Sequence, residues 1–576
     1  MLQKSGSAAF FALSISLSIS QAQGLDRSSI VQKIDASQLA KHPTWEALLH
    51  LDANQPQIKD PSFLLSGASF NANAELLATL NFLYGAKIDA VCRFPARYLW
   101  LKDQLSLPTL PLENCADWVE LSTRAPLDTL SLAFVSESVS LPASMMGHSF
   151  IKLTGRKSNG EHVEHAISFY TPAETYNLPK LYWEAMVSGK DGVFALAPYQ
   201  EVNKKYLDEE KRNVWTYDLD TSVNDRLLIQ AHLLELKQTA LLYWFHSYNC
   251  ATLLRNLIGI TGRLSPNTQW WVTPKDLVKA VNESGLVTRT QVQLSSEWLI
   301  DHQAGLTTEP PSALTGMLAK AHLDLELSQQ KINVEQWLAA VNALPDHDGQ
   351  LKIEQSSNPS NSPADSQFLF GQYRMSGENR LRIGLIPLSH QFLDIQAHAQ
   401  AETQLEFMSG TLSWAKASGL RLDHLNIYAM RSLNPWNSST RRISSEFKLA
   451  YDQLAPHSLL ERGIQILSGV GGTYRTHQRV DVYGLLGLNV SKAVGTYRLW
   501  GTHEWGAVTR LGSSVKAHLS IKYADAVGPQ AVRVLQRSAA LTSAISKMLS
   551  INFHLSQTST SGRNENKQEA IFKFLF

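Results

Sequence analysis

The chain has 576 residues, a formal net charge of +1 and only 18% charged residues. This length exceeds what one hydrophobic core usually holds, so about three domains are expected. The near-neutral charge argues against a chain that binds nucleic acid or another polyanion through bulk electrostatics. The charged fraction is below the about 25% typical of soluble domains. Aromatic residues make up 9% of the chain and include 14 tryptophans. This composition suits a chain with much internal or lipid-facing surface.

The N-terminus has the three parts of a secretory signal. Lys4 supplies the positive charge, residues 8–19 form the apolar stretch, and Ser20-Gln21-Ala22 is a small-x-small cleavage site. The apolar stretch is too short to cross a bilayer as a helix, and no cysteine follows it as a lipidation site. The sequence therefore predicts a signal peptide at 1–22 and export.

The cysteines are Cys92, Cys115 and Cys250. An odd number in an exported chain leaves one thiol over. Cys92 and Cys115 are close in sequence and outside the central segment, so we expect them to pair and Cys250 to stay free. A free Cys250 is either reactive or a buried inert residue.

Residues 23–120 are predicted to form a helical extension, because 45–51 and 74–85 show helical periodicity and Gly85 is a stop signal. Arg93 and Arg97 come after Gly85 in the sequence. They could bind an anionic headgroup, but a structural pairing with carboxylates is favoured.

Residues 121–300 are predicted to be a mixed α+β domain. Strands are expected at 130–135, 193–197 and 213–217, and a hairpin at 148–154 and 162–170. His148 starts the hairpin, opposite Ser168 to Tyr170. A long helix is expected at 224–242, where Glu235 is assigned to a helix-surface pair.

The stretch SYNCATLLRNLIG, residues 247–259, predicts a short helix that begins at Cys250. Ser247 or Asn249 can cap its first turn. A thiol there feels the positive end of the helix dipole, which is expected to lower its pKa. Cys250 is thus a candidate nucleophile with His148 as its base, and the backbone N–H groups of Cys250 and Ala251 could form an oxyanion hole.

Other histidines offer weaker candidates. His246 could lie beside the thiol, although a solvated position is preferred. His162 and His165 could orient His148, face solvent or form a metal pair. Two histidines without a third ligand are weak grounds for zinc, and no phosphate-binding glycine loop or dinucleotide fingerprint occurs. No metal and no cofactor are expected.

Residues 301–366 are predicted to be a connector, with a helix at 331–344 and a low-complexity linker at 356–366. From 367 to 576 the pattern changes to strict alternation. Apolar residues share one face in 515–523 and 549–555, and the chain ends with Phe572, Phe574 and Phe576 on one face. Turns are expected near Gly471-Gly472 and Gly528-Pro529. About ten to twelve strands of this length, ending in an aromatic strand, favour an outer-membrane β-barrel; a soluble β-sandwich or calyx is the alternative.

Three stretches, PASMMGHSFIKL, NVWTYDLD and YWFHSYNCATLL, resemble the Lnb-type periplasmic domain, a family named for a lipoprotein N-acyltransferase. The resemblance covers roughly residues 120–290, and the flanking regions resemble the N-terminal extension and β-rich C-terminal region of proteobacterial members. It implies a circularly permuted papain-like α+β fold, similar to permuted relatives of NlpC-type peptidases and of lecithin:retinol acyltransferase. His148 and Cys250 fall on the family's catalytic His and Cys, with His165 or Ser168 as a third polar residue. The barrel is a departure from the acyltransferase members.

The implied function is that of an envelope thiol enzyme that forms an acyl-Cys intermediate from a membrane lipid or lipoprotein ester. The implied location is the outer membrane, with the catalytic domain in the periplasm and no nucleic-acid partner. The alternatives are an NlpC-type cell-wall peptidase or amidase, and a non-catalytic outer-membrane scaffold.

Overall fold

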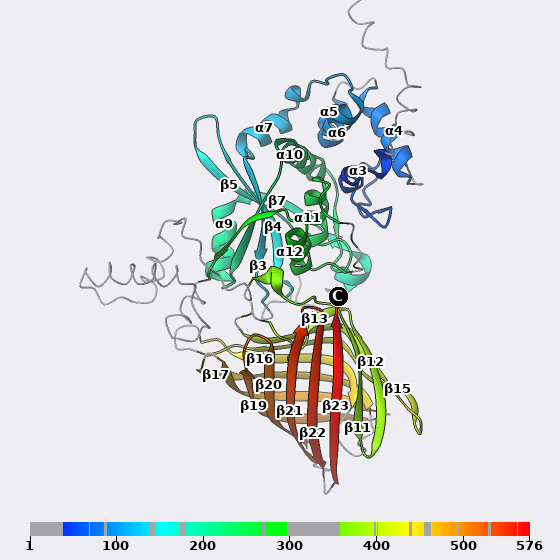
Figure 1. Ribbon diagram of the computed structural model, residues 1–576, viewed down its shortest axis with the longest axis vertical. Helices are drawn as coiled ribbons and strands as arrows, with labels where there is room; N and C mark the ends of the chain where they lie inside the picture. Colours follow the sequence, from blue (N-terminus) through cyan, green and yellow to red (C-terminus); the bar gives the residue numbers. More distant parts are fainter. Residues whose placement is uncertain are drawn as a thin grey trace, which may run out of the picture.

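The computed structural model places a mixed α/β part at one end and a β-barrel at the other (Figure 1). It describes residues 39–67, 70–85, 89–138, 145–172, 180, 183–265, 267, 269, 271–295, 358–396, 399, 401–436, 441–453, 462–477, 479–493, 496–527, 532–560 and 563–576. The predicted signal peptide and the predicted helix at 331–344 lie outside the described residues.

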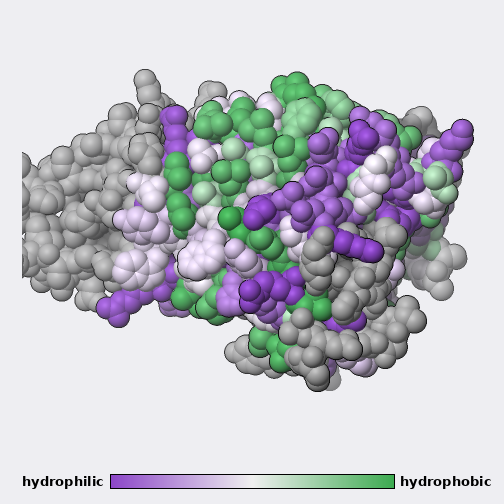
Figure 2. Space-filling model, turned by 90° about the horizontal axis from the view of Figure 1, so that it is seen from below, coloured by the Kyte–Doolittle hydropathy of each residue, from purple (hydrophilic) through white to green (hydrophobic). Residues whose placement is uncertain are grey.

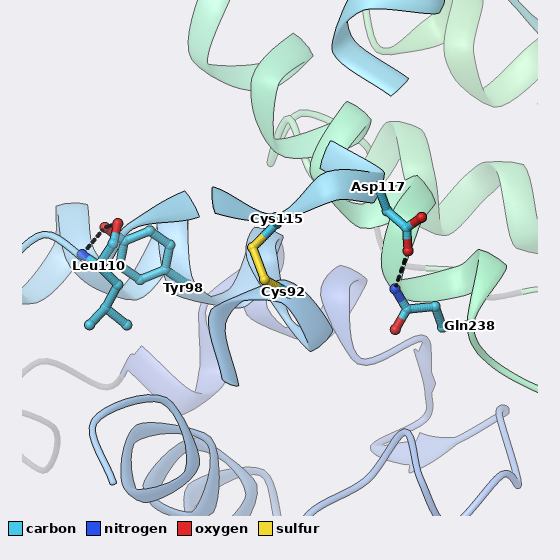
Figure 3. Close-up of a disulfide and its surroundings, with 6 residues drawn as sticks. All are labelled: Cys92, Tyr98, Leu110, Cys115, Asp117 and Gln238. Carbon is cyan, nitrogen blue, oxygen red and sulfur yellow. Dashed lines mark hydrogen bonds between the residues drawn. A yellow bond between two sulfur atoms is a disulfide. The ribbon is translucent and has the colours of Figure 1, made fainter. Parts of the chain in front are cut away.

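The N-terminal region is helical, as predicted. Its elements are η2 (Leu39–Lys41), α3 (Pro43–Leu48), the short strands β1 (Leu51–Asp52) and β2 (Gln55–Pro56), α4 (Ala72–Leu83), α5 (Ala90–Arg93), α6 (Pro95–Leu105), η3 (Leu112–Asn114) and α7 (Ala116–Arg124). Cys92 and Cys115 form a disulfide that ties α5 to the start of α7 (Figure 3). Cys250 is free and buried. The predicted pairing is therefore confirmed.

A buried polar network joins this region to the central domain. Arg97 Nη1 lies 2.9 Å from Glu75 Oε1, and Glu235 accepts hydrogen bonds from the backbone N–H groups of Ala96 and Arg97. Glu235 also contacts His232 Nδ1 at 2.7 Å. The structural role preferred for Arg97 is confirmed. The assignment of Glu235 to a surface pair is wrong, because its side chain is fully buried and its partners come from a region about 140 residues earlier in the chain.

The central domain is built on an antiparallel six-stranded sheet in the order β10-β8-β3-β4-β5-β7. Its strands are β3 (Thr129–Val135), β4 (His148–Arg156), β5 (His162–Tyr170), β7 (Val193–Pro198), β8 (Val214–Leu219) and β10 (Val287–Gln293), and β6 (Lys190–Asp191) pairs separately with β9 (Leu242–Tyr243). The predicted hairpin is present, with Phe150 opposite Ser168.

The two faces of this sheet carry different cores. One face shares a large apolar core with the N-terminal helices and with α10 (Val223–Lys237), α11 (Cys250–Gly259) and α12 (Pro274–Glu283). The other face packs Val135 and Phe150 against Tyr199 of α9 (Tyr199–Lys204) and Tyr206 of η6 (Lys205–Glu209). This division decides how the ends of β4 and α11 meet.

The end of the predicted linker is ordered and docked. η8 (Pro359–Asn361) contacts α12, and Asp365 Oδ1 lies 2.6 Å from Lys275 Nζ, with both side chains buried. Lys279 Nζ also donates to the carbonyl of Pro363 at 2.6 Å. The segment predicted as a low-complexity linker at 356–366 is thus held against the central domain over its described residues by an ion pair and a hydrogen bond.

Residues 367–576 form a closed antiparallel barrel. In the described part of the chain its strands are β11 (Gln367–Met375), β12 (Glu378–Ile386) extended by β13 (Leu388–His390), β14 (Glu402–Ala415), β15 (Gly419–Leu433), β16 (Ser444–Gln453), β17 (Arg462–His477), β18 (Val480–Ala493), β19 (Thr496–Arg510), β20 (Val515–Val527), β21 (Arg533–Ser546), β22 (Leu549–Thr560) and β23 (Arg563–Leu575). The last strand pairs with β11, and β12 pairs with β14, so 12 strands close the ring.

The alternating residues divide between an apolar outer wall and a charged interior. Leu519, Ile521, Phe553, Phe572 and Phe574 are among the exposed large apolar side chains, and seen from the barrel end, hydrophobic and hydrophilic residues gather in separate areas (Figure 2). The predicted outward faces are therefore confirmed, and such a wall is typical of a barrel in lipid.

Charged side chains form ion pairs in the interior of the barrel. Arg431 contacts Glu446 at 2.7 Å and Glu504 at 2.8 Å, and Lys516 contacts Glu402 at 2.6 Å. At the end near the central domain, the segment after β13 folds inward, where the Phe392 ring packs edge-on against His518 with centroids 5.0 Å apart. Paired charges and the segment after β13 therefore line the interior of the barrel in its described residues.

One predicted turn is wrong. Gly471 and Gly472 lie within β17, and a side chain on Gly471 would meet the carbonyl oxygen of Gly484 on β18 at 1.9 Å. Glycine is required there by close approach of two strands. The turn predicted at Gly528-Pro529 falls between β20 and β21 but lies outside the described residues.

Candidate functional site

His148 is the first residue of β4 and is reached through a glycine turn. Gly147 has φ +80°, and a side chain at this position would meet the Phe134 ring at 2.8 Å. Only glycine combines this backbone conformation with such close packing. His148 pairs with Val135 on β3, and its ring lies 6.1 Å from the ring of Tyr206. Its Nε2 atom is buried with no hydrogen-bond partner among the described residues.

Cys250 is the first residue of α11. The cap is Asn249, one of the two predicted candidates, whose side chain accepts from the N–H groups of Ala251 at 2.9 Å and Thr252 at 3.1 Å. Thr252 returns the interaction by accepting from the Asn249 N–H. This reciprocal capping box fixes the start of the helix and the direction of the thiol.

The backbone that carries His148 and the start of α11 lie together at one end of the sheet. α11 packs against β4, and the backbone N–H of Ser149, which directly follows His148, hydrogen-bonds to the sulfur of Cys250. Alternation along β4 places His148 on the face of Phe150 and Tyr206, whereas α11 covers the opposite face. The thiol thus lies against the backbone of the residue after His148, and Tyr206, which packs near the His148 ring, has its pKa raised in part by Cys250.

Burial dominates the electrostatics of the site. It lowers the pKa of His148 to about 3, with Arg212 and Lys205 adding to the shift, so the imidazole is neutral at physiological pH. Burial also raises the pKa of the Cys250 thiol, although hydrogen bonds from Ser149 N–H and the Tyr243 hydroxyl favour the thiolate. The prediction that the helix dipole lowers this pKa is wrong for the resting protein, because desolvation outweighs it. At rest the imidazole of His148 is neutral and the thiol of Cys250 is protonated.

The other predicted site residues are distributed unevenly. Ser168 pairs with Phe150 on the face of His148 and is buried. His165 pairs with Leu153, five positions along β4 from His148 and about 17 Å away at strand spacing. Its pKa is lowered by burial, then by Arg124 and Lys157, which lie at that far end. The structure brings Ser168 towards His148 but not His165.

Two further predictions concern the surroundings of the thiol. The Ala251 N–H donates to the Asn249 side chain and, like the N–H groups of Ser149 and Cys250, also lies at the Cys250 sulfur. His246 stacks edge-on between Trp244 and Trp271, with centroids 5.9 and 6.2 Å away, and is partly buried. The preferred solvated position of His246 is therefore only partly correct, since two indole rings enclose it.

Tyr243 and Tyr206 are the neighbours of the site that sequence reasoning missed. Tyr243 hydrogen-bonds to the thiol, and the pKa of its own hydroxyl is raised well above its usual value, first by burial and then by Cys250. Tyr243 stands in the YWF run seven residues before Cys250, and an aromatic in such a run is most often core. No spacing rule separates this tyrosine from an ordinary packing residue.

Among the residues that the structure describes, no group of three or more His, Cys, Asp or Glu side chains could hold a metal ion. His162 and His165 are therefore not joined by a third such ligand there.

Comparison with protein families gives matches that together cover most of the chain. Residues 119–284 match the Lnb N-terminal periplasmic domain. This segment is similar to that domain, and we refer to it below as the Lnb domain. The Lnb domain thus contains both His148 and Cys250. Residues 37–104 and 356–574 match two domains of unknown function, DUF7843 and DUF7840. No curated protein matches the chain.

Among solved structures, the barrel is similar to outer-membrane proteins. The KdgM porin in complex with disordered oligogalacturonate is 11% identical, covering 36% of this chain and 99% of the porin, with a TM-score of 0.24. The anion-selective porin from Comamonas acidovorans is 11% identical over 37% and 98%, with a TM-score of 0.21. The COG4313 outer membrane channel from Pseudomonas putida F1 is 7% identical over 37% and 96%, with a TM-score of 0.27.

The protein is an outer-membrane protein with a periplasmic domain. The family of residues 119–284 gives the compartment, and the apolar outer wall of the closed barrel gives the membrane. In the described part of the chain, no helix is long and apolar enough to cross a bilayer.

Proposed function

We propose that the protein is an envelope thiol acyltransferase or lipid hydrolase with a permuted papain-like catalytic domain. The observation that carries this proposal is the free, buried Cys250 at the capped start of α11, hydrogen-bonded to the residue next to His148. A nucleophilic sulfur with an imidazole base and a charge-stabilising backbone is the general equipment for acyl transfer.

In the first half-reaction, the Cys250 sulfur attacks the carbonyl carbon of an acyl ester while His148 Nε2 accepts the thiol proton. The C–O bond of the ester then breaks, and the imidazolium returns the proton to the departing alkoxide, which leaves as an alcohol. The acyl group remains on Cys250 as a thioester. The neutral His148 has a ring nitrogen without a partner among the described residues that can accept this proton. Because burial lowers its pKa, the step requires the negative charge that develops on the bound substrate to stabilise the imidazolium.

In the second half-reaction, an amine or water attacks the thioester carbon and gives its proton to His148. The C–S bond breaks, and Cys250 recovers its proton. The N–H groups of Cys250, Ala251 and Ser149, which lie at the sulfur, are the donors that we assign to the oxyanion; the Ala251 N–H is shared with the Asn249 cap. Ser168 is the remaining candidate for the third polar residue.

The raised thiol pKa is compatible with this mechanism. Cysteine need not be ionised at rest if its proton leaves as the carbon–sulfur bond forms, and a buried neutral pair avoids the cost of burying two charges. An apolar environment also suits an acyl chain as substrate.

The test is product analysis with the full-length protein reconstituted in vesicles that contain isotope-labelled glycerophospholipid and an N-terminally free lipopeptide. The proposal predicts lysophospholipid together with acylated peptide or free fatty acid, and none of these from Cys250→Ser. Parallel incubation with peptidoglycan tests a cell-wall peptidase. Muropeptide release without any change in the lipids, or no product in either arm, would contradict the proposal.

A further inference from the structure

The contact between the Lnb domain and the barrel lies on the outer wall of the barrel. Met145, Met146 and Trp271 of the Lnb domain form one buried apolar cluster with barrel residues, joined at its edge by Phe245; we call these four residues the collar. The barrel contributes Leu388, Leu405, Phe407, Tyr428 and Met430. The Phe245 ring lies 5.8 Å from the Phe407 ring.

The side of the wall follows from the register of the strands. Leu388 pairs with Phe407, and Phe407 pairs with Tyr428, so all three share one face. The neighbour of Phe407, Glu406, accepts hydrogen bonds from Ser409 and Asn426 on the interior side. The collar therefore covers the lipid-facing surface of β13–β15 and does not lie over the interior of the barrel.

The same wall continues as exposed apolar surface. Below the covered pairs, β14 and β15 present large apolar side chains that are 37–69% exposed: Met408, Leu412, Trp414, Leu420 and Leu422. These side chains continue the same outer wall beyond the collar, so a bilayer around β14 and β15 borders the collar.

Hydrogen bonds connect the collar to the candidate site. The Asn249 side-chain amide donates to the carbonyls of Phe245 at 3.1 Å and Val272 at 2.9 Å, the latter next to Trp271. On the other side, Met146 is separated from His148 by Gly147 alone. The residues that touch the barrel wall are thus adjacent to the residues that hold the nucleophile and its base.

Exposed aromatic and apolar residues flank the collar. Met186, in η5 (Glu184–Ser188), packs on the same cluster, whereas Trp183 is 58% and Val187 47% exposed on either side of it. Tyr170, which follows the site along β5, is 41% exposed. Tryptophan and tyrosine concentrate where a membrane protein meets the interface of the bilayer.

We propose that the Lnb domain rests on the periplasmic leaflet of the outer membrane, with Trp183 and Val187 inserted in it, and that glycerophospholipid acyl chains reach Cys250 laterally along the outer wall of β14–β15. The proposed contact between the Lnb domain and the leaflet rests on the position of the collar and of the exposed residues beside it. The delivery of an ester to Cys250 rests on the proposed function, and it makes the lipids of this leaflet the acyl donors.

The experiment places a photo-crosslinking benzoylphenylalanine at one position of the full-length protein in vesicles of phosphatidylethanolamine and phosphatidylglycerol. Trp183 is the test position, and Val119, which is 46% exposed on α7 at the far end from the barrel, is the matched control (Figure 1). Adducts are identified by mass spectrometry. We expect at least about tenfold more phospholipid adduct at 183 than at 119, because an interfacial side chain spends most of its time in lipid.

A second readout separates this inference from the proposed function. The double variant Trp183→Ala/Val187→Ala should lower acylation of Cys250 from vesicle phospholipid by about tenfold, while acylation from a soluble short-chain ester stays within about twofold of wild type. Equal lipid adducts at 183 and 119, or adducts to a second copy of the chain at 183, would overturn the membrane contact. Lipid adducts at 183 without any acylation of Cys250 would leave the contact in place and reject the proposed function.

Discussion

The barrel interior and the Lnb site both bury polar groups, but they treat them differently. In the barrel, Arg431 is held by Glu446 and Glu504, and Lys516 by Glu402. In the site, His148 Nε2 is buried with no hydrogen-bond partner in the part of the chain that the structure describes, and the thiol of Cys250 accepts from backbone N–H groups and the Tyr243 hydroxyl. Paired buried charges fix a structure, whereas an unpartnered buried nitrogen is costly to the fold and suits a substrate that arrives to complete it.

The largest expected effect is on the rate of Cys250 acylation when His148, the proposed base, is replaced. His148→Gln should lower the rate of Cys250 acylation by about 10²- to 10⁴-fold, the contribution usual for a general base. The rate is measured by rapid quenching with a labelled ester and intact-mass detection. Ser149→Ala, which alters the neighbouring side chain and keeps the backbone N–H, is the control and should stay near wild type. Equal rates for both variants would show that His148 takes no proton.

The next largest effect is on the free energy of unfolding when an ion pair inside the barrel is removed. Glu504→Ala leaves Arg431 and Tyr483 without one of their partners, and we expect a loss of about 3–5 kcal/mol in the free energy of unfolding. Urea unfolding in detergent measures it. The matched control is Asp525→Ala, whose ion pair with Arg533 is exposed and should contribute at most about 1 kcal/mol. Similar losses for the two variants would mean that the interior pairs are no stronger than surface ones.

A smaller effect is the pH dependence of the periplasmic part. Burial lowers the pKa of His148 to about 3 and that of His50 well below its usual value. Their neutral forms are the folded ones, so their contribution is complete above about pH 6.5 and falls as the unfolded chain takes up protons below it. Each residue should reduce the free energy of unfolding by about 1.4 kcal/mol per pH unit in this window.

The measurement is the slope of stability against pH between about pH 7 and 5, followed by near-ultraviolet circular dichroism. His50→Gln can keep a hydrogen bond to Tyr248, which contacts His50 Nδ1 at 2.7 Å, and should lower the slope by one proton. An unchanged slope in this variant would show that His50 is already protonated in the folded protein.

The smallest effect concerns the hydroxyl group at the sulfur. Tyr243→Phe removes a hydrogen bond that favours the thiolate, so the pKa of Cys250 should rise further. A net hydrogen bond of about 0.5–1.5 kcal/mol corresponds to about two- to tenfold slower alkylation by iodoacetamide at a fixed pH. The pH profile of alkylation is the readout, and a profile that moves towards lower pH would contradict the assigned hydrogen bond.

Much of the fold follows from local patterns. The alternation in 515–523 and 549–555 predicts the outer wall of the barrel, since a strand presents every second residue to the same side. The hairpin at His148 and the start of α11 at Cys250 were also predictable from local patterns. Turn and capping residues act on their immediate neighbours.

What the sequence did not reveal depends on distant contacts. Glu235 has the spacing of a surface helix residue, but α6 places Ala96 and Arg97 against it. Gly471 resembles a turn residue until β18 approaches it. The thiol pKa is set by the packing of several elements around Cys250, which outweighs the local helix dipole.

The central claim is that Cys250 becomes acylated with His148 as its base. The direct measurement is intact mass spectrometry of the full-length protein after brief exposure to vesicles of a single defined phospholipid, quenched in acid. The account predicts a mass increase of one acyl group that maps to the peptide of Cys250, is removed by hydroxylamine and is absent in Cys250→Ala. An unmodified Cys250 in protein that consumes the lipid, or an acyl group on another residue, would contradict it.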